Sequence, residues 1–292
     1  MLPVKKILPA ASNSLTLEIN VTPGSKRISS FQKTIHRYYE IHGRSLPWRS
    51  TGDPYHIVVS EIMLQQTQVD RVVPKYLEFI HRFPDFHSLA RASLDQVLAL
   101  WHGLGYNRRA LSLKKLAEKV IDTFDSRLPE SIDELITLPG IGKATASSIA
   151  AFAFNKPVVF IETNIRTVFI HFFFPEQEKV TDTEITEMVE CTLDRKNPRK
   201  WYNALMDYGV MLKQNHPNPG RKSAHYKKQT PFEGSHRQIR GMVLKALLNA
   251  KVLTRKQLLD KIDREEHRVD TALDHLIAES IVIKKRGKFS IA

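Results

Sequence analysis

The feature that most constrains the fold is a helical spacing of apolar residues that runs from Phe31 to about Lys213. Apolar side chains recur there at intervals of three and four residues, which places them on one face of an α-helix. Glycine and proline separate the stretches, and none of them alternates apolar and polar residues as an exposed strand does. We therefore predict an all-α body. The stretches are FQKTIHRYYEIHG, VSEIMLQQTQVDRVVPKYLEFIHRF, SLDQVLALWHG, NRRALSLKKLAEKVIDTF, SIDELITL, KATASSIAAFAF, NIRTVFIHFFF and TEITEMVECTLDR.

The segment after this body has a different composition. Residues 213–235 are rich in Pro, Gly, Lys and His and poor in apolar residues, as basic linkers are. Three short helical patterns follow, and then two β-like runs joined at Arg286 and Gly287, an order typical of a winged helix-turn-helix. Such a module can bind DNA or dock a protein, and both interpretations stay open. We expect an N-terminal arm (1–28), a helical body (29–212), a basic linker (213–235) and a winged-helix-like module (236–292).

The charge balance favours an acidic partner. Lys and Arg number 44 against 31 Asp and Glu, which gives a net charge of +13. Nucleic acid ranks ahead of an anionic membrane because no basic amphipathic anchor is found. No apolar run approaches the roughly 20 residues that span a bilayer, and the first residues lack the apolar core of a secretory signal. We expect a monomeric, cytoplasmic protein, nucleoid-associated in a bacterium, that binds no membrane.

The segment LPGIGKATA, residues 138–146, places two glycines in a tight turn before a helix that starts near Lys143. Glycine lets the chain turn sharply and lets its amides approach a partner closely. A helix N-terminus favours an anion. The segment is similar to the helix-hairpin-helix of proteins that hold the DNA backbone without reading sequence. The alternative is an ordinary turn between two helices.

A glutamate in an apolar helix is the second notable feature. Glu61 lies beside Ile62, Met63 and Leu64, with two amides, Gln65 and Gln66, directly behind. Carboxylates are seldom buried without a partner, although one in a first turn can simply complement the helix dipole.

Five segments together resemble a known family. LPWR (46–49), DPYHIVVSEIMLQQTQVDRVVPKY (53–76), LWHGLGYNRRA (100–110), LPGIGKATA and NIRTV (164–168) follow the order and spacing of the helix-hairpin-helix (HhH-GPD) DNA glycosylase superfamily. The resemblance is greatest to MutY-type adenine DNA glycosylases, because SEIMLQQTQV and GLGY distinguish that branch from endonuclease III. It implies two helical lobes with an active site between them.

The resemblance also assigns roles to residues. It makes Glu61 the general acid that protonates an extruded adenine, a role that burial favours by raising the pKa of a carboxyl group. The position of Glu162 implies the carboxylate that stabilises positive charge on the sugar, and Asn164 would orient the sugar or the water. The residues implied to contact DNA are Arg49, Gln65, Gln66, Tyr106, Leu138, Gly140, Gly142 and Lys143. Of these, the resemblance makes Gln66 and Tyr106 wedge residues, which lie around the opened base pair.

Three positions depart from the family pattern. Glu162 stands where the family has aspartate, and its extra methylene can misplace the carboxylate by about an ångström, which can cost on the order of a hundredfold in rate. Ala144 stands where bifunctional relatives carry a Schiff-base lysine, so strand cleavage is not expected. The only cysteine is Cys191, so the family's iron–sulfur cluster cannot form. Lys213, Arg221, Lys222 and Lys228 would contact phosphates in place of the cluster loop.

These observations predict a monofunctional DNA glycosylase that removes adenine mispaired with 8-oxoguanine or guanine. Its partner would be double-stranded DNA that contains a mismatched or oxidised base pair. We expect no metal and no cofactor, apart from a monovalent cation that the resemblance allows at the hairpin turn. One alternative is a glycosylase for thymine or uracil opposite guanine, and another is a catalytically impaired protein that binds mismatched or abasic DNA. We expect residues 236–292 to add affinity for all duplexes rather than to change base choice.

Overall fold

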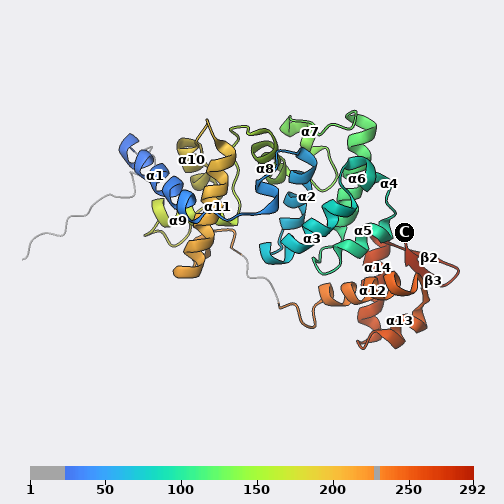
Figure 1. Cartoon of the computed structure of the whole chain (residues 1–292). Helices are drawn as coiled ribbons and strands as arrows, with labels where there is room; N and C mark the ends of the chain where they lie inside the picture. The colour runs from blue at the N-terminus through green and yellow to red at the C-terminus, as the bar shows by residue number, and fades with distance from the viewer. Residues whose placement is uncertain (1–23, 227–230) are drawn as a thin grey trace, which may run out of the picture.

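The computed structural model describes residues 24–226 and 231–292 (Figure 1). The body is helical, and within residues 24–226 the only β-type pairing is an isolated bridge between Val180 and Ser223. The predicted all-α body is confirmed. Its elements are α1 (Ser25–His42), η2 (Pro47–Arg49), α2 (Pro54–Leu64), α3 (Val69–Arg82), α4 (Phe86–Arg91), α5 (Leu94–Trp101), α6 (Arg108–Thr123), α7 (Ile132–Ile136), α8 (Lys143–Phe154), α9 (Thr163–Phe173), α10 (Asp182–Thr192), α11 (Pro198–Asn215) and η3 (Pro219–Lys222).

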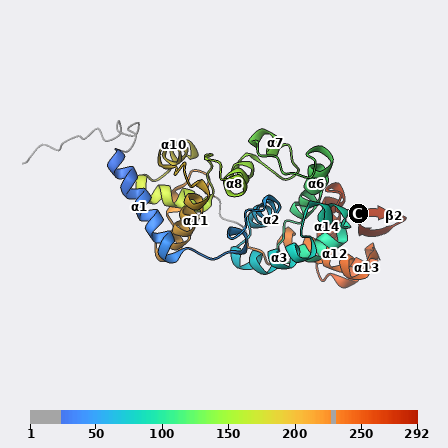
Figure 2. The same ribbon diagram turned by 45° about the horizontal axis from the view of Figure 1, so that its top comes forward.

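The helices form two lobes, as the resemblance implied. Helices α2 to α7 make one lobe, and α1 joins α9, α10 and α11 in the other (Figures 1 and 2). Helix α8 lies between the lobes and packs against α2 on one side and α11 on the other. Residues from η2, α2, α8 and α11 therefore meet where the lobes join.

Local sequence signals explain where the central helices begin. Asp53 caps α2 by accepting a hydrogen bond from the Tyr55 amide at 2.8 Å, and Pro54 occupies the first turn, where its missing N–H costs nothing. Thr181 and Glu184 form a reciprocal capping box at α10. Buried aromatic side chains hold α1 against α9 and α11. Phe31 of α1 makes edge contacts with Phe169 of α9 and Trp201 of α11.

The C-terminal residues form the predicted winged-helix-like module, which packs against α5 (Figure 1). Its helices are α12 (His236–Ala250), α13 (Arg255–Lys261) and α14 (Glu266–Ala278), and its strands are β1 (Val252–Thr254), β2 (Val282–Lys285) and β3 (Lys288–Ile291). The strands pair antiparallel in the order β1-β3-β2. Arg286 and Gly287 make the predicted turn, both with positive φ (49° and 74°). Strand β1, three residues long, was not predicted.

The regions outside the body and the module are only partly described. Helix α1 begins at Ser25, inside the segment that the sequence assigned to the N-terminal arm (1–28). The rest of the arm, residues 1–23, and Lys228 of the basic linker lie outside the described residues. Helix α11 extends into the predicted linker as far as Asn215, and η3 follows it. Within the described part of the chain, the helices fall short of the length and apolar character needed to cross a membrane.

Candidate active site and DNA interface

Glu61 lies on α2 at the junction of the lobes. The Ser148 hydroxyl of α8 donates a hydrogen bond to Glu61 Oε2 at 2.5 Å. Burial raises the pKa of Glu61 to about 7, against the effect of that hydrogen bond, and the nearby Glu162 raises it further. The carboxyl group therefore keeps a proton available near neutral pH. Sequence reasoning missed Ser148, since it lies in a run of small residues that reads as simple helix packing.

A small cavity of about 30 Å³ adjoins Glu61. A space of this size takes water-sized molecules and no more. Its walls come from both lobes, so a movement of one lobe against the other would enlarge it. The lining residues are Trp48 and Arg49 of η2, Ile57, Ser60, Glu61 and Leu64 of α2, Phe152 of α8, and Arg199, Asn203 and Met206 of α11.

Arg49, predicted to contact DNA, is held beside this cavity by a buried carboxylate. Asp207 accepts hydrogen bonds from Arg49 Nη1 at 2.7 Å and Nη2 at 2.8 Å, and from Arg44 Nε at 2.7 Å. The side chain of Asp207 is 1% exposed and that of Arg49 is 8% exposed. Burial alone would raise the pKa of Asp207, but the two arginines hold it below its ordinary value. Arg49 is thus part of a fixed framework next to Glu61.

Glu162 is the N-terminal cap of α9. Its Oε1 accepts hydrogen bonds from the amides of Asn164 at 2.7 Å and Ile165 at 2.9 Å, and its Oε2 accepts one from Asn164 Nδ2 at 3.2 Å. Burial raises the pKa of Glu162, while the positive charge of Lys213 and these hydrogen bonds oppose the shift. The longer side chain is therefore turned back onto its own helix, and Asn164 fixes its orientation.

Close packing of α9 against α11 brings Lys213 to this carboxylate. A Cβ on Gly209 would lie 2.4 Å from the Asn164 carbonyl oxygen, so only glycine fits there. Lys213 lies one turn further along α11, on the same face as Gly209. Burial lowers the pKa of Lys213, and the charge of Glu162 opposes this shift. The two groups lie close enough for the charge of each to shift the pKa of the other.

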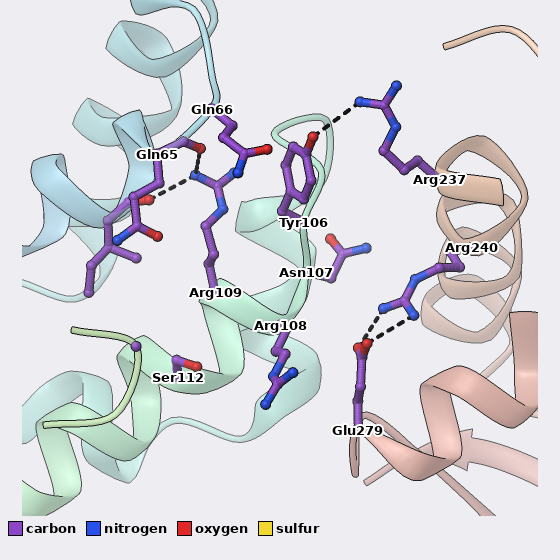
Figure 3. Close-up of a pocket in the computed structure, with 12 residues that line it drawn as sticks. Gln65, Gln66, Tyr106, Asn107, Arg108, Arg109, Ser112, Arg237, Arg240 and Glu279 are labelled. Carbon is purple, nitrogen blue, oxygen red and sulfur yellow. Dashed lines mark hydrogen bonds and ion pairs between the residues drawn. The ribbon is translucent and has the colours of Figure 1, made fainter. Parts of the chain in front are cut away.

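The predicted wedge residues lie on two strained turns. Gln66 follows α2 and Tyr106 precedes α6, and both have positive φ (54° and 48°), which is uncommon outside glycine. Arg109 joins the two turns, since its Nη1 donates to the Gln65 carbonyl oxygen at 2.5 Å and its guanidinium lies 5.4 Å from the centre of the Tyr106 ring (Figure 3). Sequence reasoning gave Arg109 no role, although GLGYNRRA contained it.

The predicted hairpin turn between α7 and α8 is confirmed. Leu138 is buried, Gly140 has φ +83°, and Gly142 is the N-cap of α8, with Lys143 exposed in its first turn. A Cβ on Gly140 would lie 2.8 Å from Ser112 Cβ, so a side chain there would be both strained and crowded. The exposed start of α8 is a suitable phosphate cradle.

Among the described residues, no group of three or more His, Cys, Asp or Glu side chains is placed to hold a metal ion. The chain's single cysteine, Cys191 on α10, does not fit the four-thiolate ligand set of an iron–sulfur cluster. The monovalent cation at the hairpin turn stays a prediction.

The known proteins that the chain is similar to are base excision DNA repair proteins and DNA glycosylases. Residues 59–191 match the model of the HhH-GPD superfamily of base excision DNA repair proteins. The chain is 39% identical to an adenine DNA glycosylase of Buchnera aphidicola over 62% of this chain and 52% of the relative, so it spans about half the length of that protein. It is 32% identical to an adenine DNA glycosylase of Mycolicibacterium smegmatis over 87% of this chain and 94% of the relative. A solved thermostable thymine-DNA glycosylase is similar with a TM-score of 0.59 and 25% identity, over 66% of this chain and 91% of that one.

Proposed function

Because the chain belongs to the HhH-GPD superfamily of base excision DNA repair proteins, we propose that it is a monofunctional adenine DNA glycosylase. Its substrate would be adenine mispaired with 8-oxoguanine or guanine in double-stranded DNA. The observation that carries the proposal is Glu61, a buried carboxyl group with a pKa of about 7 beside a cavity between two lobes. A general acid for a neutral leaving base needs this protonation behaviour.

The proposed reaction uses both buried carboxyl groups. Glu61 gives its proton to a ring nitrogen of the extruded adenine, and the C1′–N9 bond breaks with its electron pair leaving on the base. Glu162, held by the amides at the start of α9, opposes the positive charge that develops on the sugar. Water then adds to C1′ and its proton passes to the Glu61 carboxylate. The net change is hydrolysis of one N-glycosidic bond.

The lobes must separate for this reaction. The cavity beside Glu61 is about 30 Å³, too small for a purine, so the extruded base enters only if η2 and α2 move relative to α11. The hairpin turn at Gly140 and Gly142 would hold the DNA backbone while the wedge residues occupy the opened base pair. The net charge of +13 supports duplex DNA as the partner, and we expect the enzyme to act as a monomer.

The expected product is an abasic site. Ala144, exposed in the first turn of α8, offers no amine for a Schiff base, and the reaction needs no iron–sulfur cluster. The strand should therefore break only after alkali treatment. Strand breakage without alkali, with borohydride trapping of a covalent complex, would show instead that Lys143 or another amine acts.

A base-release assay on duplexes with A·8-oxoG, A·G, T·G and U·G pairs tests the function. We expect release of adenine only. Release of thymine or uracil would favour the alternative suggested by the likeness to a thymine-DNA glycosylase. Tight binding without any release would identify a catalytically impaired DNA-binding protein, in which Glu162 only caps α9.

A further inference from the structure

The hairpin formed by β2 and β3 carries four exposed basic residues outside the site described above. These residues, here named the basic wing, are Lys284, Lys285, Arg286 and Lys288. In both views of the molecule the hairpin lies at the end furthest from α1 (Figures 1 and 2). The wing is therefore separate from the cavity beside Glu61, whose walls come from η2, α2, α8 and α11.

The strand register brings like charges together in this wing. Lys285 on β2 pairs directly across from Lys288 on β3, and like charges in opposite positions destabilise a pair of strands. Arg286 follows with φ 49°, a conformation that is uncommon outside glycine. The hairpin thus concentrates positive charge at the expense of its own stability, which is expected where an external anion offsets the repulsion.

The carboxylates of the protein do not neutralise this charge. Elsewhere in the module, arginines form ion pairs of 2.5 to 3.3 Å with carboxylates, as Arg240 does with Glu279 (Figure 3); the others are Arg255, Arg264 and Arg268. Among the described residues, Lys285, Arg286 and Lys288 form no such ion pair. Their charge is therefore available to an acidic partner.

The helix that enters DNA in other modules of this type has the wrong charge here. In a helix-turn-helix the second helix lies in the major groove and contacts bases with its N-terminal residues. Helix α14 has this position, but its first turns carry Glu266 and Asp270, both paired with Arg255, and Asp274 is exposed one turn later. Its carboxylates would repel the DNA backbone, whereas the basic wing attracts it without reading sequence.

Contacts with the body fix the position of the module. Arg237 Nη1 donates a hydrogen bond to the hydroxyl of the predicted wedge residue Tyr106 at 3.1 Å. At the other end of α12, Lys251 forms an ion pair with Asp95 of α5 at 2.9 Å. The wing consequently has a defined place relative to the base pair that the wedge would open, and can reach the duplex on only one side of it.

We propose that the basic wing contacts phosphates of double-stranded DNA on one flank of the opened base pair, outside the segment held by the wedge and the hairpin turn. The inference rests on the proposed function, because it takes duplex DNA as the partner. It also assigns a surface to the affinity that the sequence predicts for residues 236–292, and it makes that affinity depend on the length and direction of the duplex.

The test measures Kd for three duplexes with a stable abasic analogue (tetrahydrofuran) opposite 8-oxoguanine. One is short, and the other two are extended by about 15 base pairs, roughly 50 Å, on one side or on the other. The double variant Lys285→Gln/Lys288→Gln should bind one extended duplex about tenfold or more weakly at about 0.1 M salt, and its salt slope should fall by up to about 2. The other two duplexes should stay within about twofold.

The matched control is Lys256→Gln/Lys261→Gln, which removes two exposed lysines from α13 of the same module. It removes the same charge and should leave all three affinities within about twofold. The free energy of unfolding in urea, which should not fall in the wing variant, shows that its hairpin stays folded.

Three results would overturn the inference. These are unchanged binding of all duplexes by the wing variant, an equal loss on both flanks, and an equal effect of the control variant. The first would leave the wing to an acidic protein surface, and the other two would indicate a general effect of charge. Dependence on one flank without adenine release by the wild-type protein would refute only the proposed function.

Discussion

Replacement of Glu61 by glutamine should change both stability and catalysis, and in opposite directions. Burial raises the pKa of Glu61 from its ordinary value of 4.5 to about 7. Between these two values the folded protein holds a proton that the unfolded chain has lost, so the carboxyl group makes folding less favourable as pH rises and has its full effect above pH 7. At about 1.4 kcal/mol for each pH unit, this corresponds to about 3 kcal/mol. Glutamine has the same shape and never ionises.

Urea unfolding at pH 5 and pH 8.5 measures this effect. The free energy of unfolding of the wild-type protein should fall over this interval by about 2 to 3 kcal/mol more than that of Glu61→Gln. Glu162 is present in both proteins, and because its charge contributes to the raised pKa of Glu61, the difference measures the ionisation of Glu61 together with its coupling to Glu162. The variant should release no adenine in single-turnover assays, and wild-type release should decline above pH 7 as Glu61 ionises. An equal pH dependence of stability, or wild-type turnover by Glu61→Gln, would refute the argument.

The remaining predictions concern the groups around Glu61. Glu162→Gln should abolish base release but keep duplex binding, whereas Glu162→Asp should retain release; wild-type single-turnover rates in Glu162→Gln would make this residue purely structural. Lys213→Met should raise the pKa of Glu162 and move the acidic limb of the pH–rate profile to higher pH, while Lys213→Arg leaves the limb in place. Asp207→Asn should lower the free energy of unfolding by about 3 to 5 kcal/mol, measured with urea, because it leaves Arg49 buried without its counter-charge; a loss below about 1 kcal/mol would contradict this.

The sequence predicted those parts of the molecule that depend on local rules. Helical spacing identified the body, and the glycines of LPGIGKATA identified the turn that has Gly140 at φ +83°. The apolar neighbours of Glu61 indicated a shielded carboxyl group, which agrees with its raised pKa. Each of these signals lies within a few residues of the feature that it predicts. Spacing and turn chemistry are therefore sufficient for them.

The partners of the site residues could not be predicted in the same way. Ser148 is 87 residues from Glu61, and Asp207 is 158 residues from Arg49, so only the packing of α8 against α2 and the closure of the two lobes bring them together. The position of the winged-helix-like module could not be predicted either, because it depends on single contacts such as that of Arg237 with Tyr106, which are 131 residues apart. Long-range contacts of this kind leave no periodic signal in a single sequence.

The segment that stands in place of the family's cluster loop is held to the body by hydrogen bonds and packing. The Val180 amide donates to the Lys222 carbonyl oxygen at 2.9 Å, and the Ala224 amide donates to the Val180 carbonyl oxygen at 2.8 Å, so η3 is attached to the start of α10. A Cβ on Gly220 would lie 2.8 Å from Thr167 Oγ1, which shows how closely η3 packs on α9. This part of the predicted basic linker is therefore not an exposed tether. Backbone hydrogen bonds and close packing fix η3 against α9 and the residues that precede α10.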